Sequence, residues 1–216
     1  MLYSTLAATL AVLQVLPVIA IPTLSSGATP RREGPVPSYG IEDITWEIVT
    51  ASGTTVNITG TVEQVFQYAE KKNIAFKQIS DVPPPSTLDD LTKNRWDPSV
   101  HRLMCFKNDN LADLEAIERG IKYLNKIPGK PVNGPGPGNC GRVSCSWNSA
   151  IYWCNNDTEV KTLDSFRAIA DGAQFVLNNC PFHPILFSGL GGWGVEGSVT
   201  MKDGWTVVVR GDHEDC

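Results

Sequence analysis

The chain has 216 residues, with 18 basic and 23 acidic side chains and a formal net charge of -5 at pH 7. This length suits one full domain with an appended segment. Because a net negative protein offers no positive field to a phosphate backbone, the composition disfavours a nucleic-acid-binding function.

Residues 1–20 are expected to form a secretory signal peptide. The apolar run Leu6–Ile21 begins soon after Met1 and passes through Val18-Ile19-Ala20, a spacing of small residues that is typical of a signal-peptidase site. The alternative, a transmembrane anchor, would need a longer run and a positive stop-transfer cluster after it. We therefore expect a secreted, extracellular protein with no membrane association after signal cleavage.

A flexible leader, or the start of a propeptide, is expected at residues 21–40, which are rich in Pro, Gly and Ser. Within it, Arg31-Arg32 is either a cleavage site for a late-secretory protease or a pair of solvated charges. Residues 80–98 form a second linker, whose run of consecutive prolines predicts an extended, semi-stiff segment.

Between these linkers, residues 41–79 predict a small ββα unit. Alternating apolar residues indicate two strands joined by a turn at Ser52-Gly53. The helix should begin at Thr61, which with Gln64 forms a capping-box pattern. Because a hairpin with one short helix is marginally stable alone, this unit would dock on the rest of the chain, be removed as a propeptide, or be partly mobile.

The core domain, residues 99–216, has the predicted element order β-α-β-β-α-β-β. Its elements are expected at Ser99–Phe106, Leu111–Leu124 with Asn110 as N-cap, the hairpin Cys140–Asn155, Leu163–Leu177, and the hairpin Val195–Val209 with a turn at Asp203-Gly204. The first six elements follow the split βαβ, ferredoxin-like plan of an α+β sandwich, with helices on one face of an antiparallel sheet. The final hairpin would supply the fourth strand and an additional edge.

The hairpin Cys140–Asn155 is expected to organise this core. With Asn148-Ser149 as its turn, opposed pairs would be Trp147 with Ala150, Cys145 with Tyr152, and Val143 with Cys154. An even number of cysteines in a secreted chain is typical of a disulfide framework. The element order favours the pairs Cys140–Cys154, Cys145–Cys180 and Cys105–Cys216, although the spacing alone does not select among the alternatives.

The run GRVSCSWNSAIYWCN, followed by a helix containing IADGAQ and a terminal cysteine, resembles a recurrent pattern in small secreted cysteine-rich fungal proteins, described as uncharacterised secreted proteins or effector candidates. The pattern covers residues from Cys105 to Cys180. The element order is also similar to the α/β sandwich of killer-toxin-like fungal effectors, a likeness that concerns the fold and not the function. This resemblance supplies no catalytic residues.

Several residues could carry chemistry, but each has a plainer structural interpretation. Two of the histidines His101, His183 and His213 could serve as acid and base in a ribonuclease-like toxin, although no spacing links them. Residues 212–215, Asp-His-Glu-Asp, could bind a metal, although a solvated acidic tail is the simpler interpretation. The glycine-rich run at 189–194 lacks the features of a phosphate-binding loop and predicts a flexible turn.

We therefore expect a non-enzymatic interaction protein of effector or toxin-like type, without cofactor or metal, that binds a host, competitor or cell-wall component. The alternatives are a secreted hydrolase or ribonuclease-like toxin that uses the histidines, and a structural role in a cell wall. Trp193 and Trp205 are expected to form the recognition surface if they are exposed. The sequons at Asn57 and Asn156 are expected to carry N-linked glycans.

Overall fold

The computed structural model describes residues 34–36, 39–76, 99–106, 110–137, 139–182, 194–213 and 216. All of them belong to one compact unit, Arg31–Cys216. The expected signal peptide, the Arg31-Arg32 pair and the linker at 80–98 lie outside the described residues. Among the residues described, none of the helices combines the length and apolar character needed to cross a membrane.

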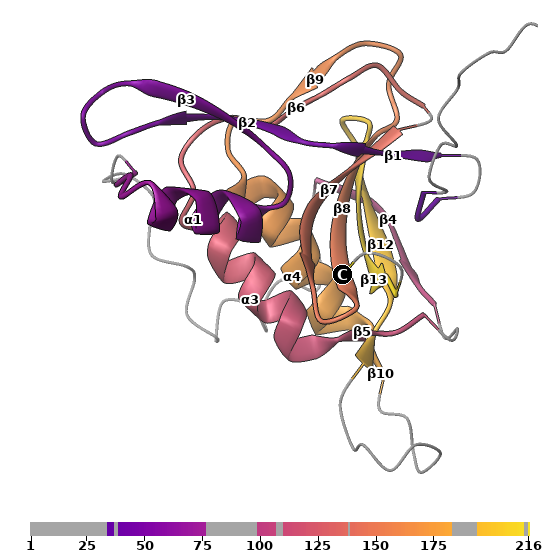
Figure 1. Cartoon of the computed structure of the whole chain (residues 1–216). Helices are drawn as coiled ribbons and strands as arrows, with labels where there is room; N and C mark the ends of the chain where they lie inside the picture. Colours follow the sequence, from indigo (N-terminus) through magenta and orange to yellow (C-terminus); the bar gives the residue numbers. More distant parts are fainter. Residues whose placement is uncertain are drawn as a thin grey trace, which may run out of the picture. The chain divides into compact units, whose positions relative to one another are not determined.

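A six-stranded sheet forms the centre of the unit (Figure 1). Its strands, in spatial order, are β1 (Gly40–Asp43), β7 (Asn139–Ser146), β8 (Ser149–Asn155), β13 (Trp205–Gly211), β12 (Gly197–Met201) and β4 (Val100–Cys105). Neighbouring strands are antiparallel, except that β1 runs parallel to β7. The sheet therefore joins a strand from the N-terminal segment to strands of the expected core.

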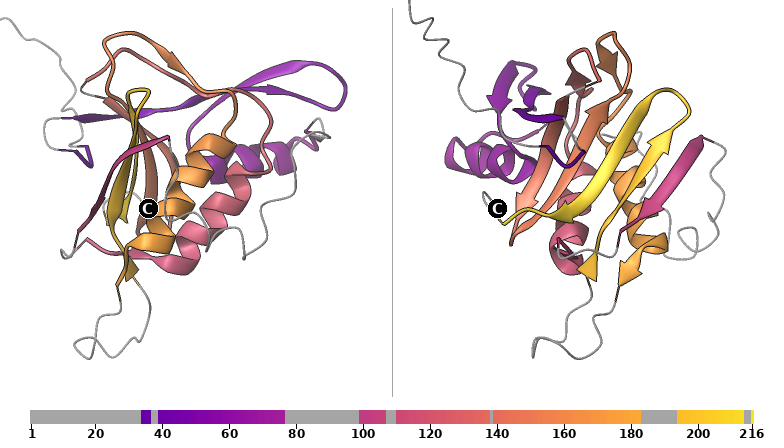
Figure 2. Two further views of the ribbon diagram at one scale, coloured as in Figure 1. Left: turned by 180° about the vertical axis from the view of Figure 1, so that it is seen from behind. Right: turned by 90° about the vertical axis from the view of Figure 1, so that its right-hand side faces the viewer.

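Two helices, α3 (Leu114–Leu124) and α4 (Arg167–Asn179), lie side by side on one face of this sheet (Figure 2). The helices can approach the sheet closely because each has a glycine that faces the strands. A Cβ on Gly120 would collide with Ser144 Oγ of β7, and a Cβ on Gly172 would lie 2.8 Å from a methyl of Val207 in β13. The N-cap of α3 is Asp113, whose carboxylate accepts a hydrogen bond from Ala116 N, and not Asn110 as expected.

Smaller elements surround the sheet. They are the hairpin of β2 (Thr45–Val49) and β3 (Thr55–Thr59), the helix α1 (Val62–Lys71), the pair β6 (Val132–Asn133) and β9 (Lys161–Thr162), and the three short strands β5 (Ala112–Asp113), β10 (Pro181–Phe182) and β11 (Gly194–Val195). The expected ββα unit and its capping box at Thr61 and Gln64 are confirmed.

The structure confirms a mixed α and β chain with helices, a mainly antiparallel sheet and three disulfides, but it does not confirm the specific ferredoxin-like topology. Strands β8 and β12 are parallel, are connected through α4 and have β13 between them, so one split βαβ unit is present. However, the last hairpin does not form an edge as expected. It lies between β8 and β4, because β12 pairs with β4 and β13 pairs with β8.

The position of β4 also explains the disulfides. Cys140–Cys154, a cross-strand pair of β7 and β8, is confirmed. The other two predicted pairs are wrong, since the bonds formed are Cys105–Cys180 and Cys145–Cys216. Cys105 bonds to Cys180 because β4 ends against the last turn of α4. Cys216, which follows β13, lies next to β7 and bonds to Cys145.

Of the three fates considered for the ββα unit, the structure shows docking. Trp46 of β2 stacks on Phe166, with ring centroids 4.2 Å apart, and donates its indole N–H to Gly60 O at 2.7 Å. Both aromatic side chains belong to the buried core that also lines α3 and α4. The unit thus shares its apolar core with the sheet.

The second face of the sheet has a separate apolar cluster, here called the second-face cluster. Its buried members are Cys140, Ala150, Tyr152, Cys154 and Val208. Val36, Tyr39, Ile41 and Cys216 pack against it, so residues from both ends of the unit cover the face opposite the helices. The segment before β1 also accepts a hydrogen bond at Pro35 O from Arg210, at 3.4 Å.

This cover predicts the effect of a truncation. A chain that begins at residue 44 lacks β1 and three of the four covering side chains, so it should be less stable than a chain that begins at residue 34 by about 2 kcal/mol or more. Urea unfolding of the two chains measures the difference. Equal stabilities would show that residues 34–43 do not contribute to the fold.

Candidate recognition site at the turn between β7 and β8

The turn that joins β7 to β8 consists of Trp147 and Asn148, one residue earlier than expected. Both have left-handed backbone conformations, with φ values of 52° and 55°, as a type I′ hairpin turn requires. The strands close at Ser146 and Ser149. Trp147 is therefore part of the turn and does not pair with Ala150.

A β-bulge in β7 changes the rest of the register. The pairing shifts between Arg142 and Ser144, so that Val143 is the extra residue. Two further predicted pairs are wrong. Because the turn lies one residue earlier, Cys145 pairs with Ala150 instead of Tyr152, and beyond the bulge Cys154 pairs with Cys140 instead of Val143. The predicted pairs assume strict alternation along both strands. A bulge breaks that assumption, because the extra residue moves every residue beyond it to the opposite face of the sheet.

Trp147 is the most exposed large apolar side chain in the part of the chain that is described, with 76% of its surface accessible. A bulky residue at positive φ is an outlier, because its Cβ crowds the following carbonyl oxygen at a cost of roughly 1–2 kcal/mol. Glycine, asparagine and aspartate are the residues that ordinarily occupy this turn. The chain thus holds a large aromatic group outward in an unfavourable backbone conformation.

Two neighbouring segments fix this turn. Ser149 Oγ accepts a hydrogen bond from the N–H of Asp113 at 2.8 Å and donates one to the carbonyl of Trp147 at 3.0 Å. On the other side, the N–H of Asp212 donates to the carbonyl of Asn148 at 2.8 Å. The turn is therefore attached to the start of α3 and to the residues that follow β13.

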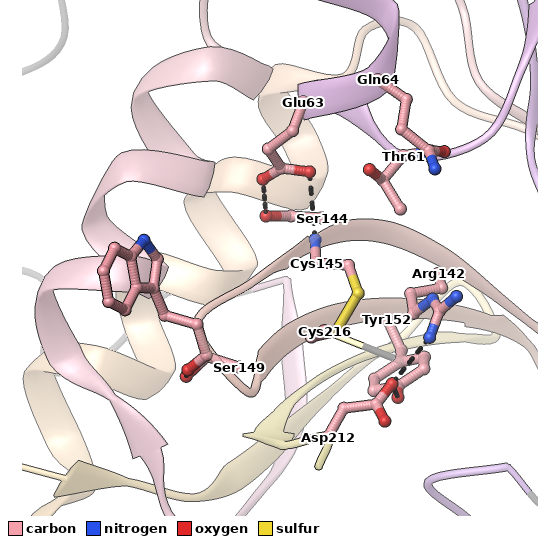
Figure 3. Close-up of a disulfide and its surroundings, with 11 residues drawn as sticks. Thr61, Glu63, Gln64, Arg142, Ser144, Cys145, Ser149, Tyr152, Asp212 and Cys216 are labelled. Carbon is pink, nitrogen blue, oxygen red and sulfur yellow. Dashed lines mark hydrogen bonds and ion pairs between the residues drawn. A yellow bond between two sulfur atoms is a disulfide. The ribbon is translucent and has the colours of Figure 1, made fainter. Parts of the chain in front are cut away.

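Helix α1 fixes the end of β7 just before the turn (Figure 3). The carboxylate of Glu63 accepts hydrogen bonds from Ser144 Oγ at 2.5 Å and from the N–H of Cys145 at 3.0 Å. Glu63 lies in the first turn of α1, where the helix dipole also stabilises a negative charge. Sequence reasoning missed this contact, although an acidic residue two positions after the capping Thr61 was a signal, since a negative charge is favourable in the first turn of a helix.

The residues after β13 form a second clamp on β7 and β8. Asp212 accepts hydrogen bonds from Arg142 at 2.9 Å and from the hydroxyl of Tyr152 at 2.7 Å, and the side chains of both charged residues are nine-tenths buried. The Cys145–Cys216 disulfide lies beside them (Figure 3). Desolvation at Tyr152, followed by its hydrogen bond to Asp212 and the charge of that carboxylate, raises the pKa of the Tyr152 hydroxyl above its ordinary value.

This clamp corrects the interpretation of the acidic tail, since Asp212 is not a solvated charge. One carboxylate oxygen of Asp212 and the sulfurs of Cys145 and Cys216 lie within 4.8 Å of one another. Both sulfurs are bonded to each other, so they offer no thiolate to a metal, and the guanidinium of Arg142 already neutralises Asp212. This group is accordingly a structural clamp and not a metal centre.

Of the two tryptophans expected to form the recognition surface, the structure describes Trp205. Trp205 is only 6% exposed and belongs to the main core, so its predicted role on the surface is wrong. Trp193 and His183 lie outside the described residues. His101, on exposed β4, is beside the turn between β12 and β13, whereas the exposed His213 follows β13 at the opposite end of the sheet. The structure does not bring these two histidines together.

The fold and the site define a disulfide-stapled module of helices and strands that presents a rigid, exposed aromatic turn. Comparisons of the chain with protein-family models, with curated proteins and with solved structures found no match.

Replacing Glu63 with glutamine should lower the free energy of unfolding by about 1–3 kcal/mol, because the amide cannot accept from both Ser144 and Cys145 in place of the carboxylate. Urea unfolding measures the loss. Glu70→Gln, an exposed change on the same helix, is the matched control and should alter stability by less than about 0.5 kcal/mol. Equal effects of the two changes would contradict a docking role for Glu63.

The raised pKa of Tyr152 predicts a loss of stability in alkali. The unfolded residue ionises near pH 10 while the folded one stays protonated, so its contribution is fully present below pH 10 and is lost as the pH rises beyond it. Between pH 8 and 11, the wild-type stability should fall more steeply than that of Tyr152→Phe, by at most about 1.4 kcal/mol per pH unit. Tyr68→Phe, at a more exposed tyrosine, should keep the wild-type slope.

Proposed function

We propose that this protein is a secreted, non-enzymatic interaction protein of effector or toxin-like type, which acts by binding a host, competitor or cell-wall component. The observation that carries the proposal is Trp147, an exposed indole held at the tip of a hairpin by clamps from separate parts of the chain. Rigid aromatic side chains make effective binding anchors because little conformational entropy is lost when a partner packs on them.

The two histidines in the described part of the chain do not support the alternative, a hydrolase or ribonuclease-like toxin. General acid–base catalysis needs two groups within reach of one substrate atom. His101 and His213 are at opposite ends of the sheet, so they do not form such a pair. The net charge of -5 also opposes the binding of RNA.

As part of the same proposal, the protein is similar to the α/β sandwich of killer-toxin-like effectors in how its layers of helices and strands are stacked. Two helices on one face of an antiparallel sheet, one split βαβ unit and three disulfides are consistent with it, whereas the strand order differs from the ferredoxin-like plan. Because fold and function are separable, the functional argument rests on the turn and not on this likeness.

Secretion and glycosylation complete the proposal. All six cysteines are paired, a state that persists in oxidising compartments. Of the two sequons, Asn57 is exposed on β3, whereas the amide nitrogen of Asn156 donates a hydrogen bond to the buried Thr206 at 2.8 Å. We therefore propose Asn57 as the principal glycan acceptor.

The proposal is tested by expressing the chain in a eukaryotic secretory host and incubating the labelled product with intact cells and isolated walls from a panel of fungi and plants. Wild type should be retained on at least one surface, and Trp147→Ala should lose most of that retention. Val132→Ala, at an exposed apolar residue of β6, is the matched control. A protein that is not retained but that hydrolyses RNA or wall polysaccharide would favour the enzymatic alternative.

The same secreted material tests the glycan assignment. Its mass should fall on treatment with an N-glycosidase, and Asn57→Gln should remove more of this mass difference than Asn156→Gln.

A further inference from the structure

We infer that the turn between β7 and β8 is a saccharide-binding site, in which the indole of Trp147 stacks on the apolar face of a sugar ring. This inference rests on the proposed binding function and names the class of ligand. It is argued from the backbone of the turn, from the polar side chains around it, and from the lack of apolar neighbours among the described residues.

The backbone of the turn is the first observation. Trp147 occupies a left-handed position that asparagine or glycine would fill without steric conflict. Unfavourable backbone conformations persist where the surrounding structure over-determines them, and they are concentrated at ligand-binding and catalytic sites. At this turn, the hydrogen bonds of Ser149 and Asn148 and the nearby Cys145–Cys216 disulfide supply that surrounding structure.

Polar side chains from separate segments are the second observation. Asp113 reaches the turn through its N–H bond to Ser149, and His213 follows the residue that bonds to Asn148. Asn110 is close because its carbonyl accepts from Gly211, the strand partner of Ser149. The turn is thus bordered by polar residues whose side chains are of the kinds that donate to and accept from sugar hydroxyls.

The surroundings do not suit a large protein interface or a membrane. Stable protein interfaces bury about 800 Å² on each partner around a cluster of apolar anchors. The other exposed large apolar residues in the described ranges are on β2, α1, β6 and the segment before β9, and are Val49, Tyr68, Val132 and Val160. β6 contacts the far end of β8 through the bond from Asn133 to Trp153 O, and β9 pairs with β6, so Val132 and Val160 do not extend an apolar surface around the turn.

The negative charge of the protein also favours a saccharide over a membrane surface as the ligand. Insertion into a membrane surface usually combines several apolar residues with lysines and arginines that attract anionic lipids. Here the net charge is -5 and Asp113 and Glu115 are exposed in the first residues of α3, beside the turn. A neutral ligand with many hydroxyls and an apolar ring face fits this environment better than an anionic one.

The experiment measures binding to insoluble chitin, cellulose and β-1,3-glucan by co-sedimentation, and to soluble oligosaccharides of glucose and N-acetylglucosamine by calorimetry. Wild type should bind at least one of them. Trp147→Ala should weaken binding by about tenfold or more, Trp147→Tyr should retain part of it, and Val132→Ala should leave it unchanged.

A further variant separates recognition from structure. Trp147→Asn removes the steric conflict in the turn, so its thermal midpoint should equal or exceed that of wild type while saccharide binding is lost. A structural tryptophan would give the opposite result, a lower midpoint with binding intact, and would overturn the inference.

The outcomes also separate this inference from the proposed function. If none of the saccharides binds, while retention on cells still depends on Trp147 and disappears when the cells are treated with protease, the ligand is a protein and the inference is wrong although the binding function stands. If retention on cells does not depend on Trp147, both are wrong. Displacement of the protein from cells by the oligosaccharide that binds in calorimetry would support both.

Discussion

Strand β8 is buried along its whole length, and the rest of the structure depends on meeting that constraint. A strand buried on both faces needs two covers, because its side chains alternate between the faces. Helices α3 and α4 supply one cover, and their glycines allow them to approach the strands closely. The other cover is made from short segments before β1 and after β13, which have no regular core of their own.

The second cover relies on polar contacts as well as on apolar ones. The pair of Arg142 and Asp212 is almost fully buried, and removing charges from water is costly unless the geometry is good and further hydrogen bonds are made. Tyr152 supplies one of these bonds. A buried pair of this kind is weak evidence for net stability, but it fixes one position for the residues after β13. That position sets Cys216 beside Cys145 and attaches Asp212 to the turn between β7 and β8.

The sequence predicted what depends on local pattern and missed what depends on distant partners. The capping box at Thr61, the ββα unit and the amphipathic helices have local signals, and the structure contains them. The bulge at Val143 and the turn at Trp147-Asn148 have no such signal, and together they displaced every predicted pair of the hairpin. The disulfides failed for a related reason, since two of three depend on which strand lies next to β4.

The candidate site was missed for the same reason. Turn preferences favour Asn148-Ser149 over a turn that contains a tryptophan, so the pattern assigned Trp147 to a strand. Hydrogen bonds from Asp113 and Asp212, which are distant in sequence, fix the turn one residue earlier. Trp205, by contrast, lies in the regular strand β13, which is buried on both faces, and it belongs to the main core with Val207 and Val209.

The cover on the second face also has a consequence for the order of folding. Its pieces are separated by most of the chain: β1 pairs with β7, and Cys216 bonds to a cysteine 71 residues earlier. During synthesis β1 can pair only after β7 has been made, and the part of the cover that contains Cys216 is added last. Such distant pairings fold slowly. The protein is therefore expected to pass through a period in which the helical face is assembled while Cys145, the partner of Cys216, is still unpaired.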